Sequence, residues 1–366
     1  MTFIITGLGT AIPPRSFSQD IALRCSLAAN GATGRRAEME RRLYELSGVQ
    51  KRHSVLLDEP LQEGTIRQSF YRALDGAGDE WPSTAARMQR YEDEAAPLAE
   101  QALRAALDEA HVSPQRISHL VTVSCTGFHS PGVDLQLIER LGLSAEVQRT
   151  HLGFMGCHAA VNGLRVAAAF ASQQTDACVA MCAVELCTLH FHPAEDRDKK
   201  VANALFADGA AAVIGQGVTG MNGAPPRCRL AATGSVVLPD SNDAMTWRIG
   251  DHGFEMTLSN KVPALIREHV RAWLESWLAR KGRRLSDIRS WAIHPGGPAI
   301  VDAVVDALEL PASAAETSRG VLAEFGNMSS PTLLFILQRL LEPLAQLPCI
   351  ALAFGPGLVA EAMLLE

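Results

Sequence analysis

Apolar and polar positions follow two different periods along most of the chain. From about residue 93 onward, short apolar runs with the character of strands alternate with segments whose apolar residues recur at helical spacing. Residues 1–92 are less regular, although FIITGLGT near the start predicts a short strand before a Gly/Pro turn. The alternation is typical of an α/β protein in which helices pack on sheets.

Two stretches of the chain repeat the same order of elements. Helical LAEQALRAALDEA and strand-like PQRISHLVTVSCTG are followed, much later, by helical HVRAWLESWLARKG and strand-like LSDIRSWAIHPGG. Ile117 and Ile288 mark an offset of 171 residues between the copies. At this offset, polar residues fall at matching strand ends and helix starts: Cys125 with His294, and Cys157 with Asn327.

This repetition favours a duplicated fold with two halves, residues 1–220 and residues 221–366. The alternative is that any two α/β segments share such a periodicity. Duplicated halves would bring their strand ends together, so we expect a site between them.

Composition narrows the class of protein. With 366 residues and 47% hydrophobic residues, the chain can fill a large core. A net charge of -7 and 5% aromatic residues argue against a nucleic-acid partner and favour small-molecule partners. The start lacks the features of a signal peptide, and we find no apolar run of about 18 residues that would span a membrane. The eight cysteines therefore predict reduced thiols in a cytoplasmic protein.

Cys157 is the first candidate for chemistry. It lies where strand-like HLGFM meets the alanine-rich segment AAVNGLRVAAAF, at a predicted helix start. Free backbone N–H groups there stabilise a thiolate, and Gly156 permits a sharp turn. Taken alone, a buried core cysteine is the simpler interpretation.

Two further residues favour a catalytic role for Cys157 over a role in the core. His294 follows the predicted strand SWAI and could serve the thiol as base or cation. Asn327 opens a helix, and its amide could donate a hydrogen bond to a developing oxyanion. Each also has a plain structural interpretation, as a turn residue before Pro295 and as an N-cap. All three occupy matching ends of the repeated halves.

Longer motifs surround these positions: GCHAAVNGLRVA, ALFADGAAAVI, WAIHPGGPAIVD, FGNMSSPTLLFIL and FGPGLVAEAMLL. With these motifs the sequence resembles the type III polyketide synthases, the chalcone and stilbene synthase family. The resemblance covers nearly the whole chain and is weakest between about residues 28 and 95. It implies a thiolase-like duplicated α-β-α-β-α layered fold.

The resemblance implies that Cys157 is the acyl-carrying nucleophile and that His294 and Asn327 complete a catalytic triad. Phe206 falls on a gatekeeper phenylalanine between the coenzyme A tunnel and the cavity, and Met256 replaces a second one. The implied substrate-binding residues are Phe206, Met256, Cys125, Cys187, His190, Trp247, Ser329, Gly355 and Pro356. Trp247 stands where plant members have a small glycine, so the cavity should be reduced.

Several other positions have alternative interpretations. Lys51 and Arg52 fall near the region where the family holds coenzyme A phosphates, and a solvated charge pair is the alternative. His158 beside the nucleophile either packs or tunes it. Ser130 replaces a methionine that reaches across the dimer in plant members, and the resemblance implies a homodimer. The HFH stretch and nearby cysteines lack zinc-site spacing, so we expect no metal.

The implied reaction loads an acyl group from acyl-CoA onto Cys157 and extends it with malonyl-CoA by decarboxylative Claisen condensation. It needs no cofactor and ends in an alkylpyrone, resorcinol or phloroglucinol-type product. In it, His294 as imidazolium would help to keep the thiolate ionised. Two alternatives are a ketoacyl synthase that makes one condensation with an acyl-carrier protein and a catalytically silent thiolase-fold subunit.

Overall fold

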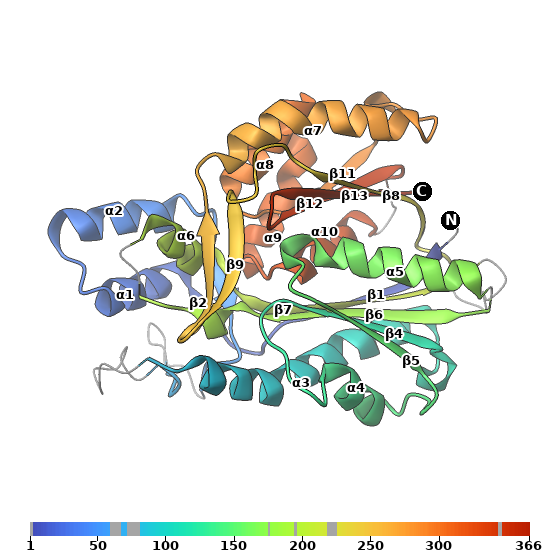
Figure 1. Ribbon diagram of the computed structural model, residues 1–366, viewed down its shortest axis with the longest axis horizontal. Helices are drawn as coiled ribbons and strands as arrows, with labels where there is room; N and C mark the ends of the chain where they lie inside the picture. The colour runs from blue at the N-terminus through green and yellow to red at the C-terminus, as the bar shows by residue number, and fades with distance from the viewer. Residues whose placement is uncertain are drawn as a thin grey trace.

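The computed structural model describes residues 3–58, 67–71, 81–174, 176–193, 196–217, 225–342 and 346–366. Figure 1 shows helices and strands stacked in layers, with α3 and α4 at the bottom, α5 and α10 in the centre, and α7 and α8 at the top. Sheet strands separate these helical layers. One hydrophobic cluster lies under α3 and α4, one under α7 and α8, and a central one packs α5 and α10 against strands of both halves. The layering confirms the expected α-β-α-β-α order.

The strands of both layers join into one continuous sheet with the order β11-β12-β13-β8-β1-β7-β6-β4-β5. Its strands are β1 (Phe3–Ala11), β4 (His119–Ser124), β5 (Gln148–Gly153), β6 (Cys178–Leu186), β7 (Asp208–Gln216), β8 (Cys228–Val237), β11 (Ser290–Ile293), β12 (Cys349–Gly355) and β13 (Val359–Leu365).

The pairing pattern repeats between the halves. In the first half, β4 pairs in parallel with β6, and β6, β7 and β1 follow in antiparallel order. In the second half, β11 pairs in parallel with β12, and β12, β13 and β8 follow in antiparallel order. An antiparallel contact between β1 and β8 joins the two. The repeated order of strands supports the predicted duplication.

The helices of the first half are α1 (Gln19–Ala29), α2 (Gly34–Glu45), α3 (Thr84–Ala110), α4 (Val133–Leu141), α5 (Ala159–Gln173) and α6 (Arg197–Leu205). Those of the second half are α7 (Val262–Ala279), α8 (Pro298–Leu308), α9 (Glu316–Phe325) and α10 (Ser330–Leu340). Two short pairs of strands lie outside the main sheet: β2 (Ser16–Ser18) with β3 (Lys51–His53), and β9 (Met245–Gly250) with β10 (Gly253–Leu258).

Helix α3 begins earlier than the apolar pattern predicts. It starts at Thr84 rather than near residue 93, and the Ser83 hydroxyl caps it by accepting a hydrogen bond from the Ala86 N–H. The buried positions Arg87 and Tyr91 recur at helical spacing, but both carry polar groups, which hides the stripe in the sequence. The regular helical structure therefore begins before residue 93, where the apolar pattern predicts it.

The polar residues predicted at matching positions do occupy equivalent ends. Cys125 follows β4 directly, and His294 follows β11 directly. Cys157 lies just before α5, and Asn327 lies just before α10. The two halves therefore bring the three candidate residues Cys157, His294 and Asn327 toward the centre of the molecule.

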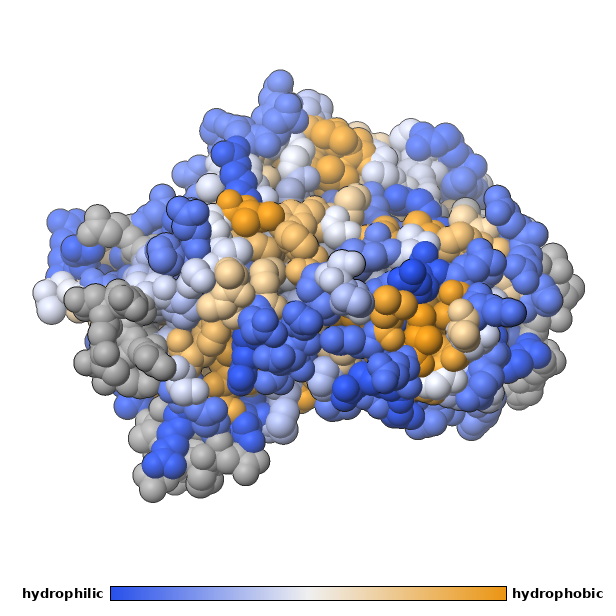
Figure 2. Space-filling model, turned by 60° about the horizontal axis from the view of Figure 1, so that its bottom comes forward, coloured by the Kyte–Doolittle hydropathy of each residue, from blue (hydrophilic) through white to orange (hydrophobic). Residues whose placement is uncertain are grey.

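The face of the molecule in Figure 2 is mainly hydrophilic, with separate hydrophobic patches. Within the part of the chain that the structure describes, no helix combines the length and apolar character needed to cross a membrane.

Candidate active site

Cys157 lies in a short 3-10 helix, η3 (Gly156–His158), that leads into α5, and only 6% of it is exposed. The turn before it requires glycine. Gly156 has a φ of 77°, and a Cβ at this position would lie 2.3 Å from Cδ of Pro356. The missing side chain therefore lets the nucleophile turn press against the loop after β12.

Two polar side chains contact the Cys157 thiol. The Ser329 hydroxyl lies 3.6 Å from the Cys157 Sγ, and the Asn327 side chain also hydrogen-bonds it. Next to them, the Gly156 N–H donates to the Cys125 Sγ at 3.0 Å. Ser329 has a φ of 55°, a strained conformation for a residue with a side chain, which is common at functional sites.

Asn327 is fixed by its backbone on both sides. Its N–H donates to the Leu205 carbonyl at 2.8 Å, and its own carbonyl accepts from the Ala207 N–H at 3.0 Å. Its side-chain Oδ1 accepts from the Ser329 N–H at 2.8 Å. That contact orients the amide and leaves its NH2 group as the donor toward the thiol. The same bridge holds Phe206 beside Asn327.

His294 is almost fully buried, and its backbone N–H donates to the Leu352 carbonyl at 2.8 Å. Neither ring nitrogen has a hydrogen-bond partner among the described residues. The ring is close enough to His158, the neighbour of Cys157, for the charge of His158 to lower the His294 pKa. A buried imidazole with both nitrogens free is available to a substrate or to the thiol.

The electrostatics differ from the expected thiolate and imidazolium. Burial raises the pKa of Cys157 to about 11, although hydrogen bonds from Ser329 and Asn327 lower it. Burial, together with His158, lowers the pKa of His294 to about 3. Burial therefore favours the neutral form of both groups, because taking a charge out of water costs more than the local partners return. His294 is thus placed to act as a neutral base.

His158 is held by packing and hydrogen bonds. Its Nδ1 lies 2.8 Å from the Asn162 Oδ1, and the Asn162 amide donates to the Glu361 carboxylate at 3.0 Å. The ring covers Gly355, where a Cβ would lie 2.4 Å from the His158 Cδ2. Gly355 therefore supports His158 and does not line the cavity beside Cys157.

Glu185 in β6 is a buried acid that sequence reasoning missed. Its carboxylate accepts hydrogen bonds from the Cys125 N–H at 2.9 Å, the Thr126 hydroxyl at 2.7 Å and the Ser330 hydroxyl at 3.2 Å. It joins the loop after β4 to the start of α10, and its charge raises the pKa of Cys157. The available signal was one acidic residue inside the apolar strand CVAMCAVEL.

Glu185 predicts a pH dependence of stability. Burial raises its pKa from 4.5 to about 7, so the native state holds the proton more tightly than the unfolded chain. The resulting stabilisation is complete below pH 4.5 and is lost as the pH rises through about 7. We expect the free energy of unfolding to fall by up to about 3 kcal/mol more between pH 5 and 8 in the wild type than in Glu185→Gln. Urea titrations across this range measure it, and parallel curves for the two proteins would contradict it.

A small cavity lies against Cys157 and has an almost entirely apolar lining. It contains most of the predicted substrate-binding residues: Cys125, Cys187, Phe206, Trp247, Met256, Ser329 and Pro356. Trp247 and Met256 face each other across the β9–β10 hairpin, and the Trp247 indole N–H donates to the Cys125 carbonyl at 2.8 Å. The indole is therefore fixed as a wall of the cavity.

His190 lies in the wall of an adjoining cavity, which shares Cys187, Phe206, Trp247 and Met256 with the first one. Its Nε2 lies 2.6 Å from the Thr126 carbonyl, and its Nδ1 accepts from the Phe254 N–H at 2.9 Å. Burial lowers the pKa of His190 to about 3. Because both ring nitrogens are engaged, the neutral His190 ring can pack against a ligand but has no nitrogen left to form a hydrogen bond with it.

The two residues predicted to contact coenzyme A are placed differently. Lys51 is exposed on β3, whereas Arg52 is 4% exposed and lines the adjoining cavity. The Arg52 guanidinium donates to the carbonyls of Asn203 at 2.6 Å and Phe206 at 3.0 Å. It is therefore already engaged by the backbone.

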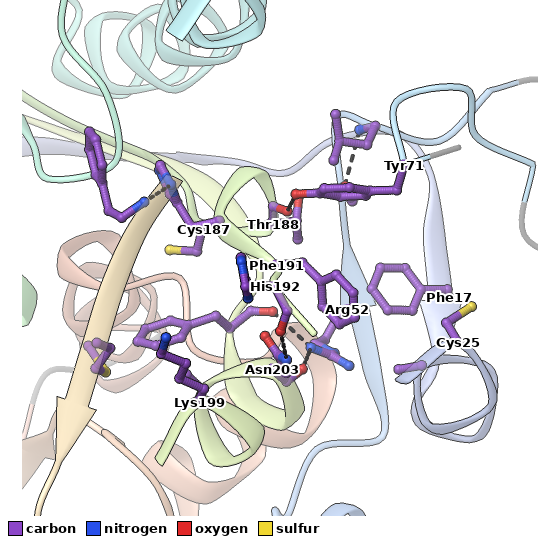
Figure 3. Close-up of a pocket in the computed structure, with 18 of the residues that line it drawn as sticks. Phe17, Cys25, Arg52, Tyr71, Cys187, Thr188, Phe191, His192, Lys199 and Asn203 are labelled. Carbon is purple, nitrogen blue, oxygen red and sulfur yellow. Dashed lines mark hydrogen bonds between the residues drawn. The ribbon is translucent and has the colours of Figure 1, made fainter. Parts of the chain in front are cut away.

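Helix α6 separates two openings that sequence reasoning did not find. Lys199, Ala202 and Asn203 face the adjoining cavity, shown in Figure 3. Lys200 and Val201 instead face a groove whose wall also includes Gly296–Ile300, the residues that follow His294 in the chain. The groove has a basic rim made by Arg36, Arg42, Arg197 and Lys200.

Family models and the sequences of known proteins indicate the same family for this chain. The chain matches the N-terminal domain of the chalcone and stilbene synthases over residues 2–218 and their C-terminal domain over residues 229–366. It is 33% identical over 365 residues to 1,3,6,8-tetrahydroxynaphthalene synthase of Streptomyces peucetius, covering 99% of this chain and 92% of that protein. It is 32% identical over 372 residues to the alpha-pyrone synthesis polyketide synthase-like Pks18 of Mycobacterium tuberculosis, covering 99% and 91%.

The comparison with solved structures indicates the same family. The crystal structure of PKS-I from the brown alga Ectocarpus siliculosus aligns with a TM-score of 0.91 at 28% identity, covering 100% of this chain and 98% of that one. The layered fold and these relatives define a condensing enzyme that transfers acyl groups. The chain belongs to the chalcone and stilbene synthase family and is a type III polyketide synthase. The ketoacyl synthase and the silent subunit are not favoured.

Proposed function

We propose that Cys157 takes an acyl group from an acyl-CoA, and that the enzyme extends this group with malonyl-CoA. The observation that carries the proposal is a buried thiol in the wall of a small apolar cavity, with the Asn327 side chain hydrogen-bonded to it and the unpartnered imidazole of His294 close to His158, the neighbour of Cys157. Such a site holds reacting groups close together and away from water.

In the loading step, neutral His294 accepts the thiol proton as the Cys157 sulfur attacks the thioester carbonyl. A new carbon–sulfur bond forms, and the bond to coenzyme A breaks. The proton then passes to the departing coenzyme A thiolate. A neutral base suits this step, because a permanently charged imidazolium could not accept the proton.

In the extension step, malonyl-CoA loses carbon dioxide and leaves an enolate of its thioester. The NH2 group of Asn327 and the ring of His294 would stabilise the enolate oxygen. The enolate carbon attacks the acyl carbonyl on Cys157 and releases the thiolate, so the acyl chain gains two carbons. Repeated extension and cyclisation would give an alkylpyrone, resorcinol or phloroglucinol-type product, in line with the pyrone and naphthalene products in the names of the relatives.

The groove between α2 and α6 would hold the coenzyme A portion. Its rim carries Arg36, Arg42, Arg197 and Lys200, and cationic side chains suit phosphate groups. Gly296–Ile300, which follow His294 in the chain, line the same groove. Lys200 also pairs with Glu40 at 3.4 Å and Arg42 with Glu45 at 4.0 Å, whereas the Arg52 guanidinium lines the other cavity and is bound to backbone carbonyls.

We also propose a homodimer located in the cytoplasm. Phe128 is 49% exposed and Met155, which precedes the nucleophile turn, is 39% exposed. Large exposed apolar side chains are typical of an interaction surface. The eight cysteines all lie in the described part of the chain and none of them forms a disulfide, as expected in a reducing compartment.

The function is tested with purified enzyme, malonyl-CoA and a panel of acyl-CoA starters, without any carrier protein. We expect release of carbon dioxide and cyclised products that mass spectrometry identifies. Turnover that occurs only when malonate is attached to an acyl-carrier protein would instead indicate a ketoacyl synthase. A folded enzyme that forms no product from any starter would refute the proposal.

A further inference from the structure

We propose that the apolar cavity of Figure 3 binds the alkyl chain of a medium- or long-chain aliphatic acyl starter. This inference rests on the proposed function and names the class of starter. It concerns the space on the side of α6 that faces away from the basic groove.

The cavity is continuous in its lining with the one beside Cys157. Cys187, Phe206, Trp247 and Met256 line both spaces, so these four side chains form the boundary between them. In Figure 3, Cys187 lies on the side opposite Phe17 and Cys25. An acyl group on Cys157 that passes this boundary would extend toward α1.

The surface of the cavity suits hydrocarbon. Its deeper walls include Phe17, Leu56, Leu57 and Phe191, and the exposed wall area is mainly apolar. Several polar groups in the wall are bound to protein atoms. The Tyr71 hydroxyl donates to the Thr188 carbonyl at 2.7 Å, and Gln68 bonds the backbone of Tyr71. A straight alkyl chain has no hydrogen-bond donors or acceptors, so it needs no polar partner from such a lining.

Two buried polar atoms in this wall, the Arg52 Nε and the Tyr44 hydroxyl, point to the competing ligand. The Arg52 Nε is buried and has no hydrogen-bond partner among the described residues. The rest of the guanidinium packs over the Phe17 ring at 5.0 Å and donates to two backbone carbonyls. A starter with a terminal carboxylate could meet this nitrogen, so the experiment includes such a starter.

The position of α6 allows both ends of an acyl-CoA to be held at once. One face of the helix borders the basic groove, and the other face borders the apolar cavity. The nucleotide could therefore lie on the charged side while the alkyl chain lies on the apolar side, with the thioester between them near Phe206.

The test compares kcat/KM for butanoyl-, hexanoyl-, decanoyl- and tetradecanoyl-CoA, each with malonyl-CoA, and for a ω-carboxydecanoyl-CoA. Each methylene that enters the cavity should add up to about fourfold. We expect kcat/KM to rise at least about tenfold from butanoyl- to decanoyl-CoA, and the ω-carboxy starter to be poorer than decanoyl-CoA. No dependence on length, or a preference for the ω-carboxy starter, would overturn the inference while leaving the proposed function intact.

Substitutions on two walls of the cavity test where the alkyl chain of the starter lies. Ala202 on α6 is only partly buried and lines the cavity, so Ala202→Phe should fill it without disturbing the core. We expect the ratio of kcat/KM for decanoyl-CoA over butanoyl-CoA to fall about tenfold or more in Ala202→Phe, and to stay near wild type in the matched Ala202→Ser. Cys25→Phe on the opposite wall should lower the same ratio.

Thermal unfolding of each variant checks that it folds. A ratio unchanged in both phenylalanine variants would refute the location. An absence of product from every starter, in the wild type as well, would instead count against the proposed function.

Discussion

Cys157→Ala is expected to abolish product formation and to leave no acyl-enzyme. The thiol is the group that lies against the small cavity with Asn327 and Ser329 in hydrogen-bonding contact. Removing a nucleophile that works with a base usually lowers kcat by a factor of about 10⁴ to 10⁶. Mass spectrometry of the intact protein after incubation with acyl-CoA measures the acyl-enzyme, and product assays measure turnover.

A matched control separates chemistry from packing. Cys349 in β12 is buried like Cys157, and burial also raises its pKa to about 11, but it lines neither of the cavities near the nucleophile. Cys349→Ala should therefore keep acyl loading and turnover, with a loss of about 1 kcal/mol in stability for the small void it leaves. An acylated Cys157→Ala protein would show that another residue carries the acyl group.

Asn327→Ala is expected to lose decarboxylation much more than acyl loading. The proposed enolate forms only when malonyl-CoA decarboxylates, and the Asn327 NH2 group is one of its two donors. Loss of one such donor usually costs about 10² to 10³ in rate. Release of labelled carbon dioxide from malonyl-CoA and the rate of acyl-enzyme formation should be measured separately.

The amide also has a structural role, so a second variant is needed. Its Oδ1 accepts from the Ser329 N–H, and Ser329 holds a strained backbone next to Cys157. Asn327→Asp keeps an oxygen for that contact but removes the NH2 donor. We expect it to lose decarboxylation as Asn327→Ala does. Normal decarboxylation in Asn327→Asp would refute the enolate role, and equal loss of loading in both variants would point to damage to the nucleophile turn.

Several properties of the site that sequence reasoning did not anticipate have a common cause. The sequence gives no measure of burial, and burial favours the neutral forms of Cys157 and His294 over the expected thiolate and imidazolium. For the same reason Arg52 looked like a free cation but is bound to backbone carbonyls. Glu185 was overlooked because an acid in an apolar strand shows its role only through partners distant in the chain, such as Ser330.

The sequence by itself determined the repeated α/β pattern, the positions of Cys157, His294 and Asn327 at matching ends, and the class of enzyme. These follow from local periodicity and from short motifs, which a linear text records fully. Only the tertiary structure decided the charge states of the site, the shared wall between its two cavities, and the two faces of α6. Those properties depend on which side chains from distant segments exclude water together, and no single segment of the sequence contains that information.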